Sequence, residues 1–208
     1  MNTKEALMKA LILIDIQHDF LPGGALAVPG GADIIPVVNQ LQPRFELVVA
    51  SQDWHPPDHK SFASAHPGKK TYDVIELRGL RQVLWPDHCV QETNGAAFPA
   101  ALSTARIEAI FRKGTDPEID SYSAFYDNGH RKSVGLAGYL REKGVTEVYL
   151  AGLAAEICVY YTAMDSLQEN FITYYIEDAV RPLVQQEFKK ALEQFAAAGG
   201  HVIHSSNL

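Results

Sequence analysis

The chain has 208 residues, with 18 Lys and Arg against 25 Asp and Glu, which gives a formal net charge of −7. A chain of this length can bury a core large enough to fold without disulfides or a structural metal. Its acidic balance excludes nucleic acid and anionic membranes as principal partners, because both require clustered Lys and Arg.

The compartment follows from the cysteines and the N-terminus. Two cysteines, Cys89 and Cys158, are too few for a disulfide framework, although their spacing leaves a single bridge open. The apolar run before Asp15 is too short to span a membrane, and no leader cleavage site accompanies it. We therefore expect an uncleaved, reduced, cytoplasmic protein.

Apolar runs alternate with amphipathic segments along most of the chain. In chain order we expect a strand at 10–14, a helix at 30–41, strands at 46–50 and 107–111, a helix at 133–142, a strand at 147–151, a helix at 156–168, a strand at 171–176, a helix at 184–198 and a strand at 201–203. This alternation predicts an α/β fold: a doubly wound, mostly parallel six-stranded sheet in a three-layer α/β/α arrangement. No repeat or linker divides the chain, so we expect one domain over 1–208.

Residues 51–99 interrupt the alternation. This stretch holds five prolines and four of the eight histidines. Because so long a connection inside a compact domain is usually functional, we treat it as an insertion with a binding role.

Four chemically different side chains follow expected strands. Asp15, Asp53 and Lys113 each follow an expected strand. Cys158 lies near the start of the helix that follows the expected strand at 147–151. In open α/β sheets, ligands bind at the carboxyl ends of the strands. Together these groups could form a base, a cation and a nucleophile, with the helix dipole lowering the pKa of the thiol. Taken singly, Cys158 could be a small core residue and Lys113 a surface lysine.

A carboxylate and several imidazoles lie in the insertion. Asp53 and His55 are two residues apart in an extended segment, so their side chains project to one side, and His59, His66 and His88 are further candidate ligands. This donor set suits Zn, Fe or Mn, whereas the alternative is a group of surface histidines bonded to loop backbone. Nearby apolar residues could be core or substrate wall: Phe20, Leu21 and Trp85.

Eight segments, in order along nearly the whole chain, carry a resemblance to a known family: LIDIQHDF (13–20), GGALAV (23–28), SQDWHP (51–56), SFA (61–63), WPDHCV (85–90), FRKG (111–114), DSYSAF (120–125) and GLAAEICV (152–159). With these the chain resembles the nicotinamidase/pyrazinamidase family of the isochorismatase-like cysteine hydrolases. The Asp-Trp-His and Trp-Pro-x-His-Cys pieces are typical of its metal-dependent nicotinamidases.

The resemblance implies an isochorismatase-like fold and the hydrolysis of nicotinamide, and also of pyrazinamide, through a cysteine thioester. By motif, the catalytic residues would be Asp15, Lys113 and Cys158. A divalent metal would be bound by Asp53, His55 and His88, with His59 as a possible further ligand, and would hold the pyridine nitrogen. Zinc is expected before iron or manganese.

The remaining site residues also follow from the resemblance. A cis peptide before Ala154 would aim the N–H groups of Ala154 and Cys158 at the substrate oxygen. The substrate would lie against four residues: Phe20, Leu21, Trp85 and Tyr122. Homo-oligomers are common in the family, so self-association is compatible with the resemblance.

One departure from the family pattern stands beside the nucleophile. Ala155 and Glu156 occupy the positions where Thr-Asp is usual. Two alternative functions therefore stay open: a metal-free amidohydrolase of the same superfamily acting on another small amide, and a catalytically silent binding protein on this fold. Metal content and the reactivity of Cys158 separate them from a nicotinamidase.

Overall fold

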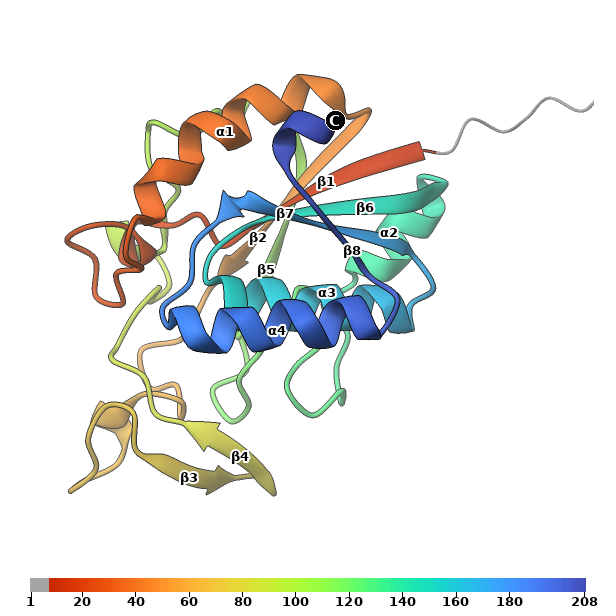
Figure 1. The fold of residues 1–208 in the computed structure, drawn as a ribbon. Helices are drawn as coiled ribbons and strands as arrows, with labels where there is room; N and C mark the ends of the chain where they lie inside the picture. The colour runs from red at the N-terminus through yellow and green to blue at the C-terminus, as the bar shows by residue number, and fades with distance from the viewer. Residues whose placement is uncertain (1–7) are drawn as a thin grey trace, which may run out of the picture.

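The computed structural model describes residues 8–208; residues 1–7, to which the expectation of an uncleaved N-terminus applies, lie outside the described part. Six strands form one sheet: β1 (Met8–Ile14), β2 (Leu47–Asp53), β5 (Ile107–Lys113), β6 (Val145–Gly152), β7 (Ile172–Val180) and β8 (His201–Ile203). Their order is β5-β2-β1-β6-β7-β8, and each neighbouring pair is parallel. The expected parallel six-stranded sheet is confirmed (Figure 1).

Four α-helices cover the two faces of this sheet: α1 (Ile34–Leu41), α2 (Leu136–Glu142), α3 (Tyr160–Gln168) and α4 (Gln185–Ala197). Helix α1 lies on one face, and α2, α3 and α4 lie on the other (Figure 1). The central strand β1 alternates between the two layers, because Leu11 and Leu13 pack in the core under α1 while Ile12 and Ile14 pack in the core under the other helices. This double burial explains its continuous apolar sequence and confirms the three-layer arrangement.

The elements differ from expectation mainly at their ends. Strand β7 continues to Val180, beyond the expected end at 176. The helix expected over 156–168 is divided into a π-helical turn at Ala155–Val159 and the regular helix α3. The helix expected from 133 begins at Leu136, because Gly135 before it has a positive φ of 97°.

The insertion contains a hairpin that the sequence analysis did not anticipate. Strands β3 (Val74–Leu77) and β4 (Leu80–Val83) pair antiparallel. Both residues of the turn, Arg78 and Gly79, have positive φ, at 54° and 78°, as a two-residue type I′ turn requires. The hairpin stands apart from the sheet on the side of α4 (Figure 1).

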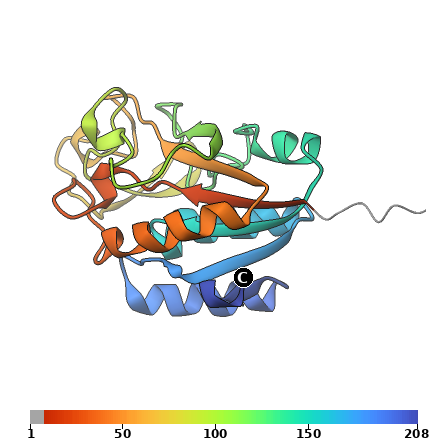
Figure 2. The ribbon, with the colours of Figure 1, turned by 90° about the horizontal axis from the view of Figure 1, so that it is seen from above.

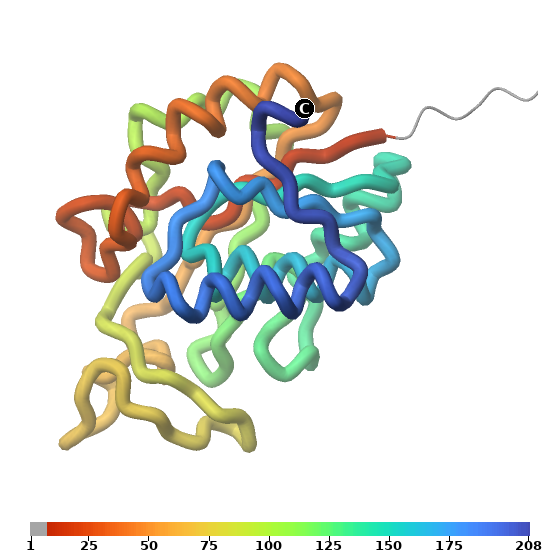
Figure 3. The backbone as a smooth tube through the Cα atoms, viewed as in Figure 1, coloured from red at the N-terminus to blue at the C-terminus, as the bar shows by residue number. Residues whose placement is uncertain are grey.

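The rest of the insertion folds back onto the carboxyl end of the sheet. The loop after β1 and the end of the insertion lie side by side (Figure 3), joined by a hydrogen bond from the His18 N–H to the Ala97 carbonyl (3.0 Å). Figure 2 shows these loops gathered at the end of the sheet where β1 terminates. The histidines of the insertion are thereby brought to the strand ends.

Candidate active site

The carboxyl ends of three adjacent strands bring the predicted polar residues together. Asp53 and Lys113 are register partners at the ends of β2 and β5, and Asp15 follows β1. Asp15 has a positive φ of 47°, which turns the chain out of the sheet directly after the strand. All three side chains are buried. Parallel pairing, rather than sequence proximity, therefore creates this cluster.

Lys113 is the centre of the cluster. Its Nζ atom lies 2.9 Å from Asp15 Oδ2, contacts Asp53 Oδ1 and donates to the Ser121 carbonyl at 2.9 Å. The same atom lies 3.6 Å from Cys158 Sγ. Burial would lower the pKa of this ammonium, but the two carboxylates raise it well above its usual range. Lys113 is therefore a permanent buried cation and not a surface lysine.

Cys158 lies in the π-helical turn between β6 and α3 and lines a cavity. Burial raises the pKa of its thiol well above the usual range, and Lys113 opposes this shift only in part. The expectation of a lowered thiol pKa is wrong for the free protein, because desolvation outweighs the nearby cation. The resting nucleophile is a thiol, so its chemistry requires a base.

Asp15 is the carboxylate placed to act as that base. One of its carboxylate oxygens lies within 4.8 Å of Cys158 Sγ, and Ser51 Oγ donates to Asp15 Oδ1 at 2.7 Å. Burial raises the pKa of Asp15 above its usual value, although Lys113 and the Ser51 hydrogen bond both oppose the shift. A raised pKa suits a group that must accept and return a proton.

A second cluster adjoins the first through Asp53. Asp53 Oδ2 lies 3.6 Å from His55 Nε2 and 3.7 Å from His88 Nε2. The Nδ1 atoms of His55 and His88 face carbonyl oxygens, of Gly114 at 3.0 Å and Pro86 at 2.8 Å. Because a carbonyl only accepts, each Nδ1 donates to it, and Nε2 is the ring nitrogen that faces Asp53.

This donor set fits a divalent metal. Despite burial, Lys113 and His55 hold the pKa of Asp53 well below its usual range, so the carboxylate is ionised. One ligand atom from each of Asp53, His55 and His88 lies within 4.8 Å of the others. One carboxylate and two imidazole nitrogens match the ligands that Zn, Fe or Mn accept.

His59 and His66 differ from the other histidines of the insertion. His59 groups with His55 and Asp120, and its Nδ1 accepts the Ser61 N–H at 3.1 Å. Burial lowers the pKa of His59 to about 4, so the ring is neutral, and its buried Nε2 has no hydrogen-bond partner among the described residues. His66 hydrogen-bonds the Lys60 carbonyl and belongs to none of the three candidate metal-binding groups of the described residues.

A small cavity opens beside both clusters. It brings together several predicted residues: Phe20, Asp53, Trp85, His88, Tyr122, Ala154 and Cys158. The sequence analysis assigned no role to four others: Leu26, Asp120, Ile157 and Leu183. Asp120 could have been noticed, because it opens one of the motif segments.

Leu21 is a correction. Its side chain does not line the cavity but is buried in the core under α1. Phe20 ends a single 3₁₀ turn and Leu21 is extended after it, and both side chains contribute to this core. Only Phe20 of this pair reaches the cavity.

Two further residues hold the site in place. The buried amide of Gln17 donates to the Asp53 and Ala96 carbonyls and accepts the Asp53 N–H, which ties β2 to the insertion. Glu156 accepts the backbone N–H groups of Leu183 at 3.2 Å and Val184 at 2.6 Å. Glu156 therefore fastens the segment before α4 to the turn that carries Cys158.

The peptide bond between Leu153 and Ala154 is cis, as the motif leads one to expect. Ala154 and Cys158 both line the cavity, and the Ala154 carbonyl accepts the N–H groups of Ile157 and Val159.

Within residues 8–208, no helix combines the length and apolar character needed to cross a membrane.

The fold and the buried Asp-Lys-Cys cluster define an α/β protein with the groups of a cysteine hydrolase. A family model described as Isochorismatase domain matches residues 9–207, so the chain belongs to the isochorismatase family. A nicotinamidase of Acinetobacter baylyi is 44% identical over 209 residues, covering 100% of this chain and 98% of its own length.

Solved structures agree with this membership. An Acinetobacter baumanii nicotinamidase/pyrazinamidase superposes with a TM-score of 0.94 at 43% identity, over 98% of this chain and 99% of its own. A Pyrococcus horikoshii pyrazinamidase in complex with zinc has a TM-score of 0.78 at 38% identity, over 94% and 98%.

Proposed function

We propose that this chain hydrolyses nicotinamide to nicotinate and ammonia, and pyrazinamide by the same route. The observation that carries the proposal is the position of Lys113 Nζ, 2.9 Å from Asp15 and 3.6 Å from Cys158 beneath the cavity. One buried cation thus contacts both the base and the nucleophile of an amide hydrolysis. Full-length relatives that act on nicotinamide support the choice of substrate.

The first half of the reaction forms a thioester. Asp15 takes the proton of Cys158, and Lys113 stabilises the thiolate as it forms. The sulfur attacks the carboxamide carbon while the backbone N–H groups of Ala154 and Cys158 stabilise the oxyanion, at about 2.7–4 kcal/mol per donor in measured systems. Asp15 returns its proton to the nitrogen as the carbon–nitrogen bond breaks, and ammonia leaves.

The second half regenerates the enzyme. Asp15 now takes a proton from water, which attacks the thioester carbon and releases nicotinate, and the proton passes to Cys158. The ring of the substrate rests between Phe20 and Trp85, and Tyr122 holds Trp85 in place by accepting its indole N–H at 3.3 Å. The same ring position admits pyrazinamide.

A divalent metal on Asp53, His55 and His88, zinc before iron or manganese, would supply a Lewis acid for the ring nitrogen. These residues fit that role because the imidazole nitrogens of His55 and His88 and the ionised carboxylate of Asp53 converge beside the cavity. Lys113 holds Asp53 ionised and in place for the metal as well as contacting Cys158.

Ammonia release from nicotinamide tests the proposed reaction. The metal-loaded protein should release one ammonia per nicotinate, and Cys158→Ala should release none. A thioester should accumulate on Cys158 when the reaction is quenched in acid and analysed by mass spectrometry. The proposal is contradicted if the intact, metal-loaded protein releases no ammonia, or if Cys158→Ala releases as much as the parent protein.

A further inference from the structure

A second, larger hollow continues from the catalytic cavity toward the surface. It has about 1060 Å³ of open space and lies between the β3–β4 hairpin and the start of α4. Four residues line both spaces: Trp85, Tyr122, Ile157 and Leu183. The hollow is therefore a vestibule of the active site, which we call the aromatic vestibule.

Four aromatic rings form a contact series along this route. The centroids of Tyr72 and Trp85 are 6.1 Å apart, those of Trp85 and Tyr122 are 6.2 Å apart, and those of Tyr122 and Tyr161 are 5.4 Å apart. The two inner rings, Trp85 and Tyr122, also line the catalytic cavity. An apolar ligand surface thus extends outward without a break from the position of the substrate ring.

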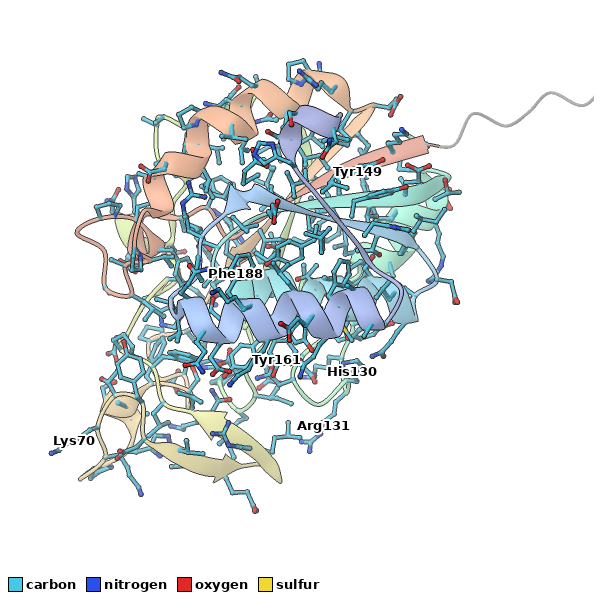
Figure 4. All side chains as sticks on the ribbon, in the orientation of Figure 1. Lys70, His130, Arg131, Tyr149, Tyr161 and Phe188 are labelled. Atoms are coloured by element: carbon cyan, nitrogen blue, oxygen red, sulfur yellow. The ribbon has the colours of Figure 1, made fainter. Side chains whose placement is uncertain are left out.

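The outer part of the vestibule is apolar and open to solvent. Tyr72 is 62% exposed, Tyr161 46% and Val184 52%. These three line the vestibule and are half of the six large apolar side chains exposed in residues 8–208. Figure 4 places Tyr161 in the space between α4 and the hairpin. Exposed apolar surface concentrated at the mouth of a site points to a ligand.

The carboxylates of the vestibule are already engaged. Glu156 accepts the N–H groups of Leu183 and Val184, and Glu187 pairs with Lys190. Arg81 also lines the vestibule and adds a positive charge at its outer part. The walls that continue from the catalytic cavity are apolar, formed by Trp85, Tyr122, Ile157 and Leu183, and they favour a flat, apolar group.

We propose that the aromatic vestibule is a substrate subsite that receives an apolar aryl group carried on the ring of an aromatic carboxamide. The inference deepens the proposed function and rests on it. We place the aryl group on the ring side of the substrate, because the proposed wall of the substrate ring, Trp85, lines both spaces. The bond cleaved is the same, and the products are the arylated carboxylate and ammonia.

The test compares nicotinamide with 5-phenylnicotinamide and 6-phenylnicotinamide as substrates. At least one phenyl derivative should be hydrolysed with a lower KM than nicotinamide. N-benzylnicotinamide, which places the same ring on the leaving amine, should gain nothing. The proposal is overturned if neither phenyl derivative improves on nicotinamide, or if the N-benzyl amide improves equally.

Variants locate the effect in the vestibule. Tyr161→Ala and Val184→Ala should each raise the KM of the favoured phenyl derivative by about two- to tenfold, the range for loss of one aromatic or aliphatic contact. Both should leave nicotinamide kinetics unchanged. Ile110→Ala, an equally exposed apolar residue (49%) on the edge strand β5, is the matched control and should change neither.

A binding measurement separates failure of this inference from failure of the proposed reaction. Calorimetry on Cys158→Ala, with and without Tyr161→Ala, measures the Kd of the phenyl derivative without turnover. Tighter binding than nicotinamide, lost with Tyr161, supports the vestibule even if nicotinamide is not hydrolysed by the parent protein. Equal Kd values with and without Tyr161 would contradict it even if nicotinamide is hydrolysed.

Discussion

Lys113 Nζ lies 3.6 Å from Cys158 Sγ, although 45 residues separate the two in the chain. The same ammonium contacts Asp15 and Asp53. One cation therefore lies against two buried carboxylates and also faces the thiol. Because the thiol is as buried as the lysine, its resting state is decided by the competition between desolvation and this contact.

The first prediction concerns the pH dependence of Cys158 alkylation. Burial raises the pKa of this thiol, so the thiolate fraction at pH 7 is smaller than for a free cysteine of pKa about 8.5. Iodoacetamide should therefore react slowly at pH 7, and the rate should keep rising at pH values above 8.5. Mass spectrometry separates this adduct from one on Cys89, whose pKa burial also raises.

A fast reaction at pH 7 that levels off below pH 8.5 would contradict the raised pKa. Slow alkylation of Cys158 at neutral pH therefore does not identify a catalytically silent protein, because the raised pKa favours the thiol in the proposed enzyme as well. Turnover of nicotinamide is the discriminating measurement.

The second prediction concerns Ser51→Ala. The Ser51 hydroxyl stabilises the ionised form of Asp15, so its removal should raise the pKa of Asp15 further. Asp15 acts as a base only when ionised, so activity is lost as pH falls through this pKa. The acidic limb of kcat/KM against pH should move to higher pH in Ser51→Ala.

Ser64→Ala is the control, because its hydroxyl donates to Asp87 in the insertion and not to Asp15. The limb should not move in this variant. If the acidic limb of kcat/KM in Ser51→Ala lies at the parental pH or lower, Asp15 is not the base.

The third prediction concerns Lys113→Met. The substitution leaves Asp15 and Asp53 buried without their cation, and breaking a buried pair on one side costs about 3–5 kcal/mol. Urea unfolding of the metal-free protein should show a loss of this size. Lys132→Met, which removes an exposed pair with Asp116, should change the unfolding free energy little. Equal small losses would mean that the Lys113 cluster is not a coupled charge network.

The fourth prediction concerns the metal ligands. His55→Ala and His88→Ala remove an Nε2 atom that faces Asp53, so bound metal should be lost or weakened at least tenfold. His59→Ala should retain its metal, because His59 groups with His55 and Asp120 and not with Asp53 and His88. Metal content after dialysis against a weak chelator measures both. Loss of metal in His59→Ala would make His59 a fourth ligand.

The fifth prediction concerns Glu156. Glu156→Ala leaves the N–H groups of Leu183 and Val184 without their partner, and Leu183 lines the catalytic cavity. We expect KM for nicotinamide to rise more than kcat falls, with a stability loss of about 1 kcal/mol. Glu156→Asp should behave similarly because the shorter acid does not reach both groups. Glu187→Ala is the control, since its carboxylate pairs only with exposed Lys190.

A KM unchanged in Glu156→Ala would show that the departure from the usual Thr-Asp pair does not shape the site. If kcat alone falls, Glu156 acts on the nucleophile turn and not on the cavity wall.

Much of this architecture is readable in the sequence. The apolar run at 10–14 indicates a strand buried on both faces, and Asp15, Asp53 and Lys113 were expected to meet because parallel strands share their carboxyl edge. The hairpin at Val74–Val83 was missed because its strands are short and largely solvent-exposed, so their pattern is weak. Its Arg-Gly turn was the available signal.

The sequence by itself determined which groups this protein has and that the carboxyl ends of parallel strands would bring them to one edge of the sheet. Tertiary structure decided their surroundings: burial raises the pKa of the Cys158 thiol, His59 is buried beside His55 and Asp120, and Leu21 packs in the core. It also decided that Trp85 and Tyr122 continue into an aromatic vestibule. The reason is physical: residue identity and periodicity are local, whereas desolvation and hydrogen-bond partners come from segments distant in the chain.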